Sequence, residues 1–258
     1  MNILVFDIET IPDVESGKRL YNLNGLSNKE AGEVMFTRRR QETNGSSDFI
    51  RHHLQRIVAI SVVLSTSDKL AVWTLGNLDS SEKDILQLFF EGIEKYSPTL
   101  VSWNGGGFDL PVIHYRSLLH GVQAPRYWET GKDDQGKRWN NYLSRFHERH
   151  IDLMDVIAGY QNRSVAPLTE IASMLGFPGK MSMSGDKVWD TYLDGEIDSI
   201  RNYCESDVLN TYLVYLRYEL IRGHFSQSTY DDECERLKDT LRKEDKSHLN
   251  EFLGTWEQ

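Results

Sequence analysis

The chain has 258 residues, with 29 basic and 39 acidic side chains and a formal net charge of −10. This length is enough for one large domain with a substantial core. No apolar run reaches the roughly 18–20 residues that a membrane helix needs, so we expect no contact with a membrane. We also do not expect so acidic a chain to coat duplex DNA through its overall field.

The start of the chain and its cysteines predict a cytoplasmic protein. Met1 is followed at once by an apolar stretch that already contains Asp7 and Glu9, whereas a signal peptide begins with basic residues and an apolar segment. Two cysteines, Cys204 and Cys234, are too few for a disulfide framework or a cysteine-rich zinc site.

The first part of the chain predicts three strands and an insertion. Residues 2–8 form an apolar run that is typical of a buried strand. Residues 13–56 are polar with little periodicity, which predicts an irregular, partly mobile insertion that contains one helix. Residues 57–65 and 69–75 are β-rich runs around a turn-like segment and predict a hairpin.

Helices and strands alternate in the next part. Ser80 and Ser81 can cap a helix that continues to about Tyr96. Residues 99–103 predict a short strand, which an Asn-Gly-Gly-Gly segment ends, and helical spacing resumes over residues 108–119.

The rest of the chain is largely helical. Residues 126–149 are irregular, and residues 150–155 predict a strand that runs into a helix. Helices are expected at about 167–175 and 195–222, and the charged tail from Tyr230 has apolar residues at helical spacing, so we expect one face of it to dock on the body.

This order of elements predicts an α/β fold with an antiparallel edge on a partly parallel sheet. We place the main domain at residues 1–225, with insertions at about 13–56 and 126–149, and a charged helical extension at 226–258. Several α/β folds have this order, so the motifs must decide among them.

Three acidic motifs lie in these elements. Asp7 and Glu9 are two residues apart on a strand, so both side chains leave the same face. Asp109 follows the glycine-rich segment at the start of a helix, and Tyr203 and Asp207 are one turn apart within the long helix. Taken singly, each motif has a structural explanation: a strand that ends in solvent, an acid that favours a helix dipole, or a chance spacing.

In combination, the order Asp-x-Glu, Asn-x-x-x-Phe-Asp and Tyr-x-x-x-Asp resembles the DEDD superfamily of 3′–5′ exonucleases. The tyrosine at position 203, with Asn202 where the other branch has a histidine, resembles the DEDDy branch that includes the proofreading domain of family B DNA polymerases. The segment 167–180 also looks like that of stand-alone bacterial relatives. The resemblance implies an RNase H-like (DnaQ-like) mixed five-stranded sheet flanked by helices.

The resemblance implies that four carboxylates hold two Mg²⁺ or Mn²⁺ ions for phosphodiester hydrolysis. The residues concerned are Asp7, Glu9, Asp109 and Asp207. Tyr203 would complete the catalytic set: with a normal pKa near 10 it is unsuited to be the base, and it would instead orient the attacking water.

Thr10, Asn104 and Phe108 would contact the terminal nucleotide if the resemblance holds. It further implies single-stranded 3′ ends as the substrate, with DNA favoured over RNA. Because the rest of the chain is too short for a polymerase module, we expect a free-standing nuclease. The alternatives are an exoribonuclease with the same site and a nucleic-acid-binding module without turnover; the sequence identifies no protein partner.

Two basic segments are candidates for the surface that binds the substrate, and the sequence does not decide their role. Residues 37–56 contain five arginines, and residues 126–150 mix six lysines or arginines with five aromatic residues. They could form a clamp for a single strand. Alternatively, the charges are solvated and Trp128, Trp139 and Phe146 pack the insertion onto the domain.

Other polar residues are expected to be structural. Among His150, Asp152 and Asp155, an aspartate that caps the next helix is favoured over a metal cluster. Asp186 and Asp190 are interpreted as caps or surface groups. Cys204 is expected to point away from the helix face of Tyr203 and to be buried rather than reactive.

Overall fold

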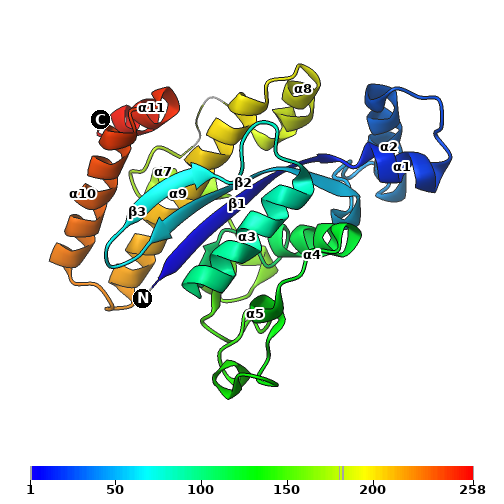
Figure 1. Ribbon diagram of the computed structural model, residues 1–258. Coiled ribbons are helices and arrows are strands. Elements are labelled where there is room, and N and C mark those ends of the chain that lie inside the picture. Colours follow the sequence, from blue (N-terminus) through cyan, green and yellow to red (C-terminus); the bar gives the residue numbers. More distant parts are fainter. Residues whose placement is uncertain (1, 180, 182, 258) are drawn as a thin grey trace.

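A mixed five-stranded sheet forms the centre of the computed structural model, which describes residues 2–179, 181 and 183–257 (Figure 1). The strand order is β3-β2-β1-β4-β5. The five strands are β1 (Ile3–Pro12), β2 (Gln55–Ser65), β3 (Leu70–Thr74), β4 (Thr99–Ser102) and β5 (His150–Asp152). β1, β2 and β3 are antiparallel neighbours, whereas β4 and β5 run parallel to β1. The predicted RNase H-like α/β fold with an antiparallel edge is confirmed.

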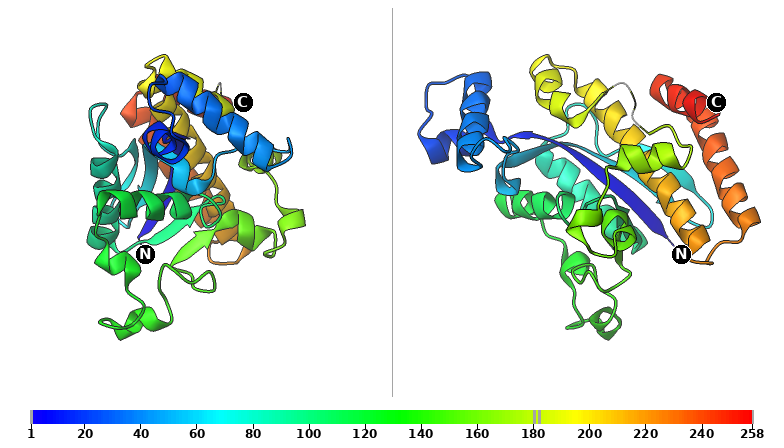
Figure 2. Two further views of the ribbon diagram at one scale, coloured as in Figure 1. Left: turned by 90° about the vertical axis from the view of Figure 1, so that its right-hand side faces the viewer. Right: turned by 180° about the vertical axis from the view of Figure 1, so that it is seen from behind.

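Helices cover both faces of the sheet (Figures 1 and 2). One layer is formed by α7 (Leu168–Met174), α9 (Ile197–Ile221), α10 (Gln227–Glu244) and α11 (Ser247–Trp256), and the other by α3 (Glu82–Tyr96), α4 (Asp109–His120) and α5 (Pro125–Trp128). Side chains alternate along β1, so that Ile3 and Val5 join the core beneath α9, while Leu4, Phe6 and Ile8 join the core beneath α3 and α4.

Short elements connect these layers. They are α6 (Leu153–Ile157), α8 (Val188–Leu193) and four single turns of 3-10 helix, η1 (His52–Leu54), η2 (Gln135–Arg138), η3 (Asn162–Ser164) and η4 (Gly185–Lys187). None of the described helices is both long and apolar enough to cross a membrane.

The C-terminal helices share the core of the sheet. Leu237 and Leu241 from α10, and Leu249 and Phe252 from α11, are fully buried in the same cluster as Val5. The prediction that the charged tail docks one face on the body is therefore confirmed.

The first insertion differs from its prediction, because it folds into two helices, α1 (Val14–Tyr21) and α2 (Asn28–Glu42), beyond one end of the sheet (Figure 2). Its small core joins Val14 and Met35 to Ile50 and Leu54. So few buried side chains leave little apolar periodicity in the sequence, and the start of α2 is fixed instead by a capping box between Ser27 and Glu30.

A buried ionic network joins this insertion to the body. Arg116 on α4 is 4% exposed; its Nη2 lies 2.6 Å from Glu82 at the start of α3, and its Nη1 also binds Asp13, which caps α1. Glu82 accepts further hydrogen bonds from the Ile57 backbone N–H and from His120. Each buried carboxylate of this network therefore has a cationic partner.

The second insertion is mostly irregular, as predicted, but other aromatic residues anchor it. Tyr127 and Tyr142 are buried and stack on each other with centroids 5.5 Å apart. Trp128, Trp139 and Phe146 are 46%, 77% and 80% exposed. The alternative that these three pack the insertion onto the domain is wrong for Trp139 and Phe146, whereas Trp128 contacts the His114 ring of α4 at 4.8 Å between centroids.

The two tyrosines are the buried pair because the interior offers partners for their hydroxyl groups. The Tyr142 hydroxyl donates to the Pro98 carbonyl at 2.7 Å, and the Tyr127 hydroxyl lies 2.8 Å from Nε2 of His114.

We expect Arg116→Met to lower the free energy of unfolding by about 3–5 kcal/mol, because it removes the arginine that both buried carboxylates, Asp13 and Glu82, share. Urea denaturation measures the change. The matched control is Arg126→Met, whose partner Glu94 is 39% exposed, and there we expect a loss of no more than about 1 kcal/mol. Equal losses in the two variants would contradict a role for the buried network.

Candidate active site

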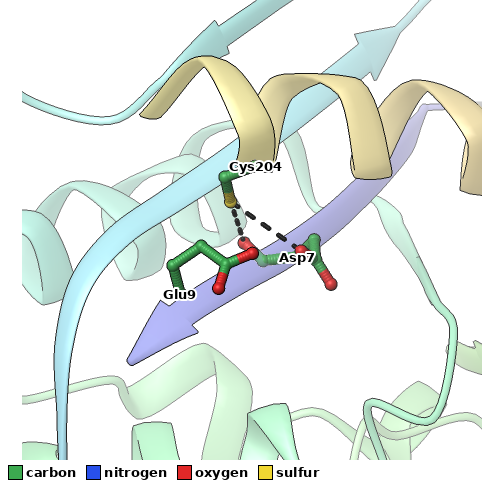
Figure 3. Close-up of side chains that lie close together, drawn as sticks. All are labelled: Asp7, Glu9 and Cys204. Atoms are coloured by element: carbon green, nitrogen blue, oxygen red, sulfur yellow. Dashed lines mark hydrogen bonds between the residues drawn. The ribbon is translucent and has the colours of Figure 1, made fainter. Parts of the chain in front are cut away.

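The first acidic pair lies within β1, on the face that α9 covers. Asp7 and Glu9 have the same alternation as Ile3 and Val5, so their carboxylates point toward α9 (Figure 3). The predicted common face is confirmed, but β1 continues to Pro12, so the pair does not end the strand. Glu9 is 8% exposed and precedes a register shift in the pairing with β2.

The glycine-rich turn brings Asp109 to the same place. β4 is parallel to β1 and leads into this turn, and α4 begins at Asp109, which is 3% exposed. The Asp109 carboxylate accepts a hydrogen bond from the Ile8 backbone N–H, which ties it directly to β1. Gly105 is required for the tight turn, because a Cβ there would overlap the Ser102 hydroxyl.

Asp152 holds the turn from the neighbouring strand. Its carboxylate accepts hydrogen bonds from the backbone N–H groups of Asn104 at 2.9 Å and Gly106 at 2.8 Å. It also caps α6 through the Asp155 N–H. The prediction of a capping aspartate is confirmed; its second role in positioning the turn was not predicted, because it depends on the parallel pairing of β4 and β5.

α9 supplies three side chains to this region. Tyr203 and Asp207 share a helix face, as predicted, and the phenol donates a hydrogen bond to the Asp207 carboxylate. The expectation that Cys204 points away from this face is wrong, although the thiol is buried as predicted. Cys204 is three residues before Asp207, so it lies on the same side of the helix and its Sγ reaches Asp7.

Neighbouring acids raise the pKa of the two carboxylates on β1. Burial raises the pKa of Asp7 well above its ordinary value, and the negative charges of Asp109, Glu9 and Asp207 raise it further. Burial also raises the pKa of Glu9, with contributions from Asp207 and Asp109. The structure thus brings together all four acids that the sequence singled out.

The other two acids titrate closer to neutral pH. Burial raises the pKa of Asp109 to about 7, although backbone N–H groups stabilise its ionised form. Burial raises the pKa of Asp207 to about 6, opposed by the hydrogen bond from Tyr203. Burial and the adjacent carboxylates, Asp207 first, raise the pKa of Tyr203 as well, so the phenol stays protonated at neutral pH and its expected normal pKa is corrected upward.

Several other buried acids have basic partners, but these four have none among the described residues; the buried Asp152, which also lacks one, accepts hydrogen bonds from backbone N–H groups instead. Glu205 is buried too, yet hydrogen bonds from His248 at 2.8 Å and from Thr74, with the charge of Lys246, outweigh burial and lower its pKa. Among the described residues, no ion pair involves any of the four site carboxylates. Hard divalent cations, which oxygen ligands hold, are the positive charges that fit this donor set.

Aromatic side chains border the site at Phe108, the residue before Asp109. The Phe49 ring lies 5.4 Å from the Phe108 ring, and the His52 ring lies 5.5 Å from it on centroid distances. Phe49 is 54% exposed although its backbone is fixed by hydrogen bonds from Arg39 and to Ser47. No sequence pattern predicted this contact, because Phe49 lies in the insertion, 59 positions before Phe108.

The other residues that the sequence analysis named lie outside the group of four carboxylates. Thr10 donates to the Gln55 side chain at 3.1 Å, and Asn104 has a left-handed backbone with φ 62° at the turn. Nε2 of His150 lies 2.8 Å from the Ser102 hydroxyl, away from any metal cluster that the described residues form. Asp190 is exposed on α8, and Asp186 is an exposed residue of η4, as expected for surface groups.

Arginines of the first basic segment, residues 37–56, contact other residues of the same insertion. Arg39 and Arg40 pair with Glu42 and Asp48, and Arg38 lies over the Tyr21 ring. Their charge is therefore partly compensated within the insertion.

The mixed five-stranded sheet carries a group of carboxylates that come from β1, from the start of α4 and from α9. This combination defines an RNase H-like domain with an acidic site. The chain belongs to the family described as predicted 3′–5′ exonucleases related to the exonuclease domain of PolB, which matches residues 47–256. Asp7 and Glu9 precede the matched range.

Two relatives and one solved structure are similar to this chain. A DNA polymerase of Archaeoglobus fulgidus is 23% identical over 175 residues, 67% of this chain and 21% of the polymerase. The catalytic polypeptide of DNA polymerase epsilon from Saccharomyces cerevisiae is 28% identical over 142 residues, 54% of this chain and 6% of that polypeptide. The family B DNA polymerase of Pyrobaculum calidifontis aligns with a TM-score of 0.48 and 18% identity, over 82% of this chain and 24% of the polymerase. The chain thus matches about a fifth or less of the length of the two sequence relatives.

We expect Asp109→Asn to stabilise the metal-free protein at pH 8. The pKa of Asp109 is about 7 in the folded state and near 3.8 otherwise, so the folded state binds the extra proton, and this group's contribution to stability is lost as pH rises from about 4 through 7. In EDTA we expect a gain of about 1–3 kcal/mol at pH 8 and a smaller gain at pH 5.

Urea denaturation at both pH values measures this difference. Asp232→Asn, an exposed position on α10, is the control and should change stability by less than about 0.5 kcal/mol. A gain for Asp109→Asn that is independent of pH would argue against a raised pKa.

Proposed function

We propose that the chain is a 3′–5′ exonuclease that removes nucleotides from single-stranded 3′ ends, with DNA as the preferred substrate. The observation that carries the proposal is that the charges of Asp109 and Asp207 act on both Asp7 and Glu9, while none of the four carboxylates has a basic partner among the described residues. The family and the sequence relatives support the same reaction class. Residues 1–225 would form the exonuclease domain, with residues 226–258 as its helical extension.

Asp7, Glu9, Asp109 and Asp207 would hold two Mg²⁺ or Mn²⁺ ions. Asp7 is central to the set, because the charges of all three others act on it, and it would supply oxygen ligands to the ions. When bound, the ions would activate water and neutralise charge on the phosphoryl oxygens. Their positive charge would also reverse the raised pKa values of the four acids.

The protein's own groups would orient the reactants. Tyr203 keeps its proton at neutral pH, so it would act as a hydrogen-bond donor to the attacking water or the phosphate and not as the general base. Glu9 and Asp207 would accept hydrogen bonds from that water. The Ile8 N–H holds the Asp109 carboxylate against β1, which limits its motion when substrate enters.

Aromatic residues would grip the end of the strand. Phe108 directly precedes Asp109 and contacts the exposed Phe49, and stacking of bases on such rings is tolerant of sequence. Thr10 follows Glu9 on β1, and Asn104 lies in the glycine-rich turn before Asp109. Both residues would contact the terminal nucleotide. No described residue distinguishes a 2′-hydroxyl, so the DNA preference follows the relatives.

Asp207→Asn should abolish hydrolysis and leave the fold intact, because the variant removes one charge from the cation site. The assay uses 5′-labelled and 3′-labelled oligonucleotides of DNA and RNA with Mg²⁺, Mn²⁺ or EDTA. For the native protein we expect a ladder from the 5′ label, immediate release of the 3′ label, and no reaction in EDTA.

The matched control is Asp198→Asn, an exposed acid in the first turn of the same helix, which should keep native activity. Full activity of purified Asp207→Asn would refute the proposed site. Faster degradation of RNA than of DNA would indicate that the protein is an exoribonuclease. Absence of any hydrolysis would indicate a nucleic-acid-binding module.

Phe49→Ala should raise KM for single-stranded oligonucleotides about 5–30-fold, because one stacking face is worth roughly 1–2 kcal/mol, while kcat at saturation should change little. Steady-state kinetics measure the two constants separately. Leu20→Ala removes another exposed apolar side chain of the same insertion, 60% exposed, and should leave KM unchanged. If both variants behave alike, Phe49 does not contact the substrate.

A further inference from the structure

Cys204 completes a three-residue group with the acidic pair of β1. Its Sγ lies 3.5 Å from the Asp7 carbonyl oxygen and 3.8 Å from Asp7 Oδ2 (Figure 3). One ligand atom from each of Asp7, Glu9 and Cys204 lies within 4.8 Å of the other two. The thiol descends from α9 and the carboxylates rise from β1, so the group joins the helix to the sheet.

The Glu9 carboxylate gives this group an unsatisfied member. Glu9 is 8% exposed, and no hydrogen bond or ion pair to its side chain is found among the described residues. Buried carboxylates elsewhere in the fold, such as Glu82 and Glu205, each bind two or more donors. The unpartnered Glu9 carboxylate points at a thiol and at a second carboxylate. Together these three groups form a ligand set for a cation.

The spacing suits a tetrahedral ion after small movements. Zinc–sulfur and zinc–oxygen bonds of about 2.3 and 2.1 Å at tetrahedral angles separate sulfur from oxygen by about 3.6 Å. The observed separation of Cys204 Sγ from Asp7 Oδ2 is 3.8 Å. The largest separation in the group is below 4.8 Å, so side-chain movements of about 1 Å close the site.

The geometry points to a binding site for a thiophilic divalent cation, Zn²⁺ or Cd²⁺, formed by Asp7, Glu9 and Cys204. Thiolate sulfur is a good ligand for these ions and a poor one for Mg²⁺ or Mn²⁺, which prefer oxygen. Binding releases the thiol proton to solvent and leaves a bound thiolate.

The site shares two carboxylates with the proposed hydrolytic centre. A thiophilic ion held by Cys204 would occupy the carboxylates that Mg²⁺ needs, so Zn²⁺ would inhibit Mg²⁺-dependent hydrolysis by competition. This consequence rests on the proposed function, whereas binding of the ion does not.

The test is a titration of the full, EDTA-treated chain with CdCl₂ in buffer without Mg²⁺. The readout is the ultraviolet charge-transfer absorption of a cadmium–thiolate bond, which does not depend on activity. We expect the band to saturate at one ion per chain in the native protein and in Cys234→Ser, since Cys234 is buried in α10 among core residues. Cys204→Ser should lose the band.

Inhibition by ZnCl₂ at fixed Mg²⁺ gives the second measurement, with each variant compared with its own uninhibited rate. The half-inhibiting Zn²⁺ concentration should rise about tenfold or more in Cys204→Ser relative to Cys234→Ser. Circular dichroism establishes that each variant is folded, and Cys204→Ala replaces Cys204→Ser if the serine variant is not.

The proposed cation site would be refuted if the native protein showed no cadmium–thiolate band. It would also be refuted if a folded Cys204→Ser variant retained the band. Hydrolysis without the band would overturn only this inference. The band without hydrolysis of any oligonucleotide would support the cation site and overturn the proposed function.

Discussion

Repulsion among four acidic side chains that lack a basic partner is the constraint on which this structure depends. Burial raises the pKa of each carboxylate, and neighbouring negative charges raise the pKa of Asp7 and Glu9 further, which opposes folding at neutral pH. The cores on both sides of the sheet hold β1, the turn before α4 and α9 in place against that repulsion. Elsewhere, the buried Glu82 and Glu205 have basic partners, and the buried Asp152 has backbone N–H donors. A fold that tolerates such a cost at one place is typical of a site that binds cations.

The sequence predicted this arrangement where local periodicity decides it. Alternation along a strand puts Asp7 and Glu9 on one face, and the spacing of one turn puts Tyr203 and Asp207 on one face of α9. The same geometry applies to Cys204, three residues before Asp207, and the expectation for this residue was wrong because adjacency to Tyr203 was given more weight than the three-residue spacing. The mixed sheet with an antiparallel edge was also predicted from the order of elements, and the RNase H-like arrangement from the family resemblance.

Contacts between distant parts of the chain were not predictable. Arg116 pairs with Asp13 across 103 positions, and Phe49 meets Phe108 across 59, and neither leaves a periodic signal. Only one of the two helices of the first insertion was predicted, for a related reason: few side chains, such as Met35, are buried in the insertion's own small core. In the second insertion the buried rings are tyrosines rather than tryptophans, because tertiary structure supplies partners for their hydroxyl groups.

The charge distribution limits how such a chain can hold a nucleic acid. The net charge is −10, the centre of the site is acidic, and arginines of the first insertion are paired with acids of the same insertion. These paired arginines therefore contribute little net attraction to phosphate. Bound cations would supply positive charge at the scissile phosphate, and exposed rings such as Phe49 would supply stacking that is independent of charge. Because both contributions act over short distances, this arrangement favours recognition of one strand end over binding along a duplex.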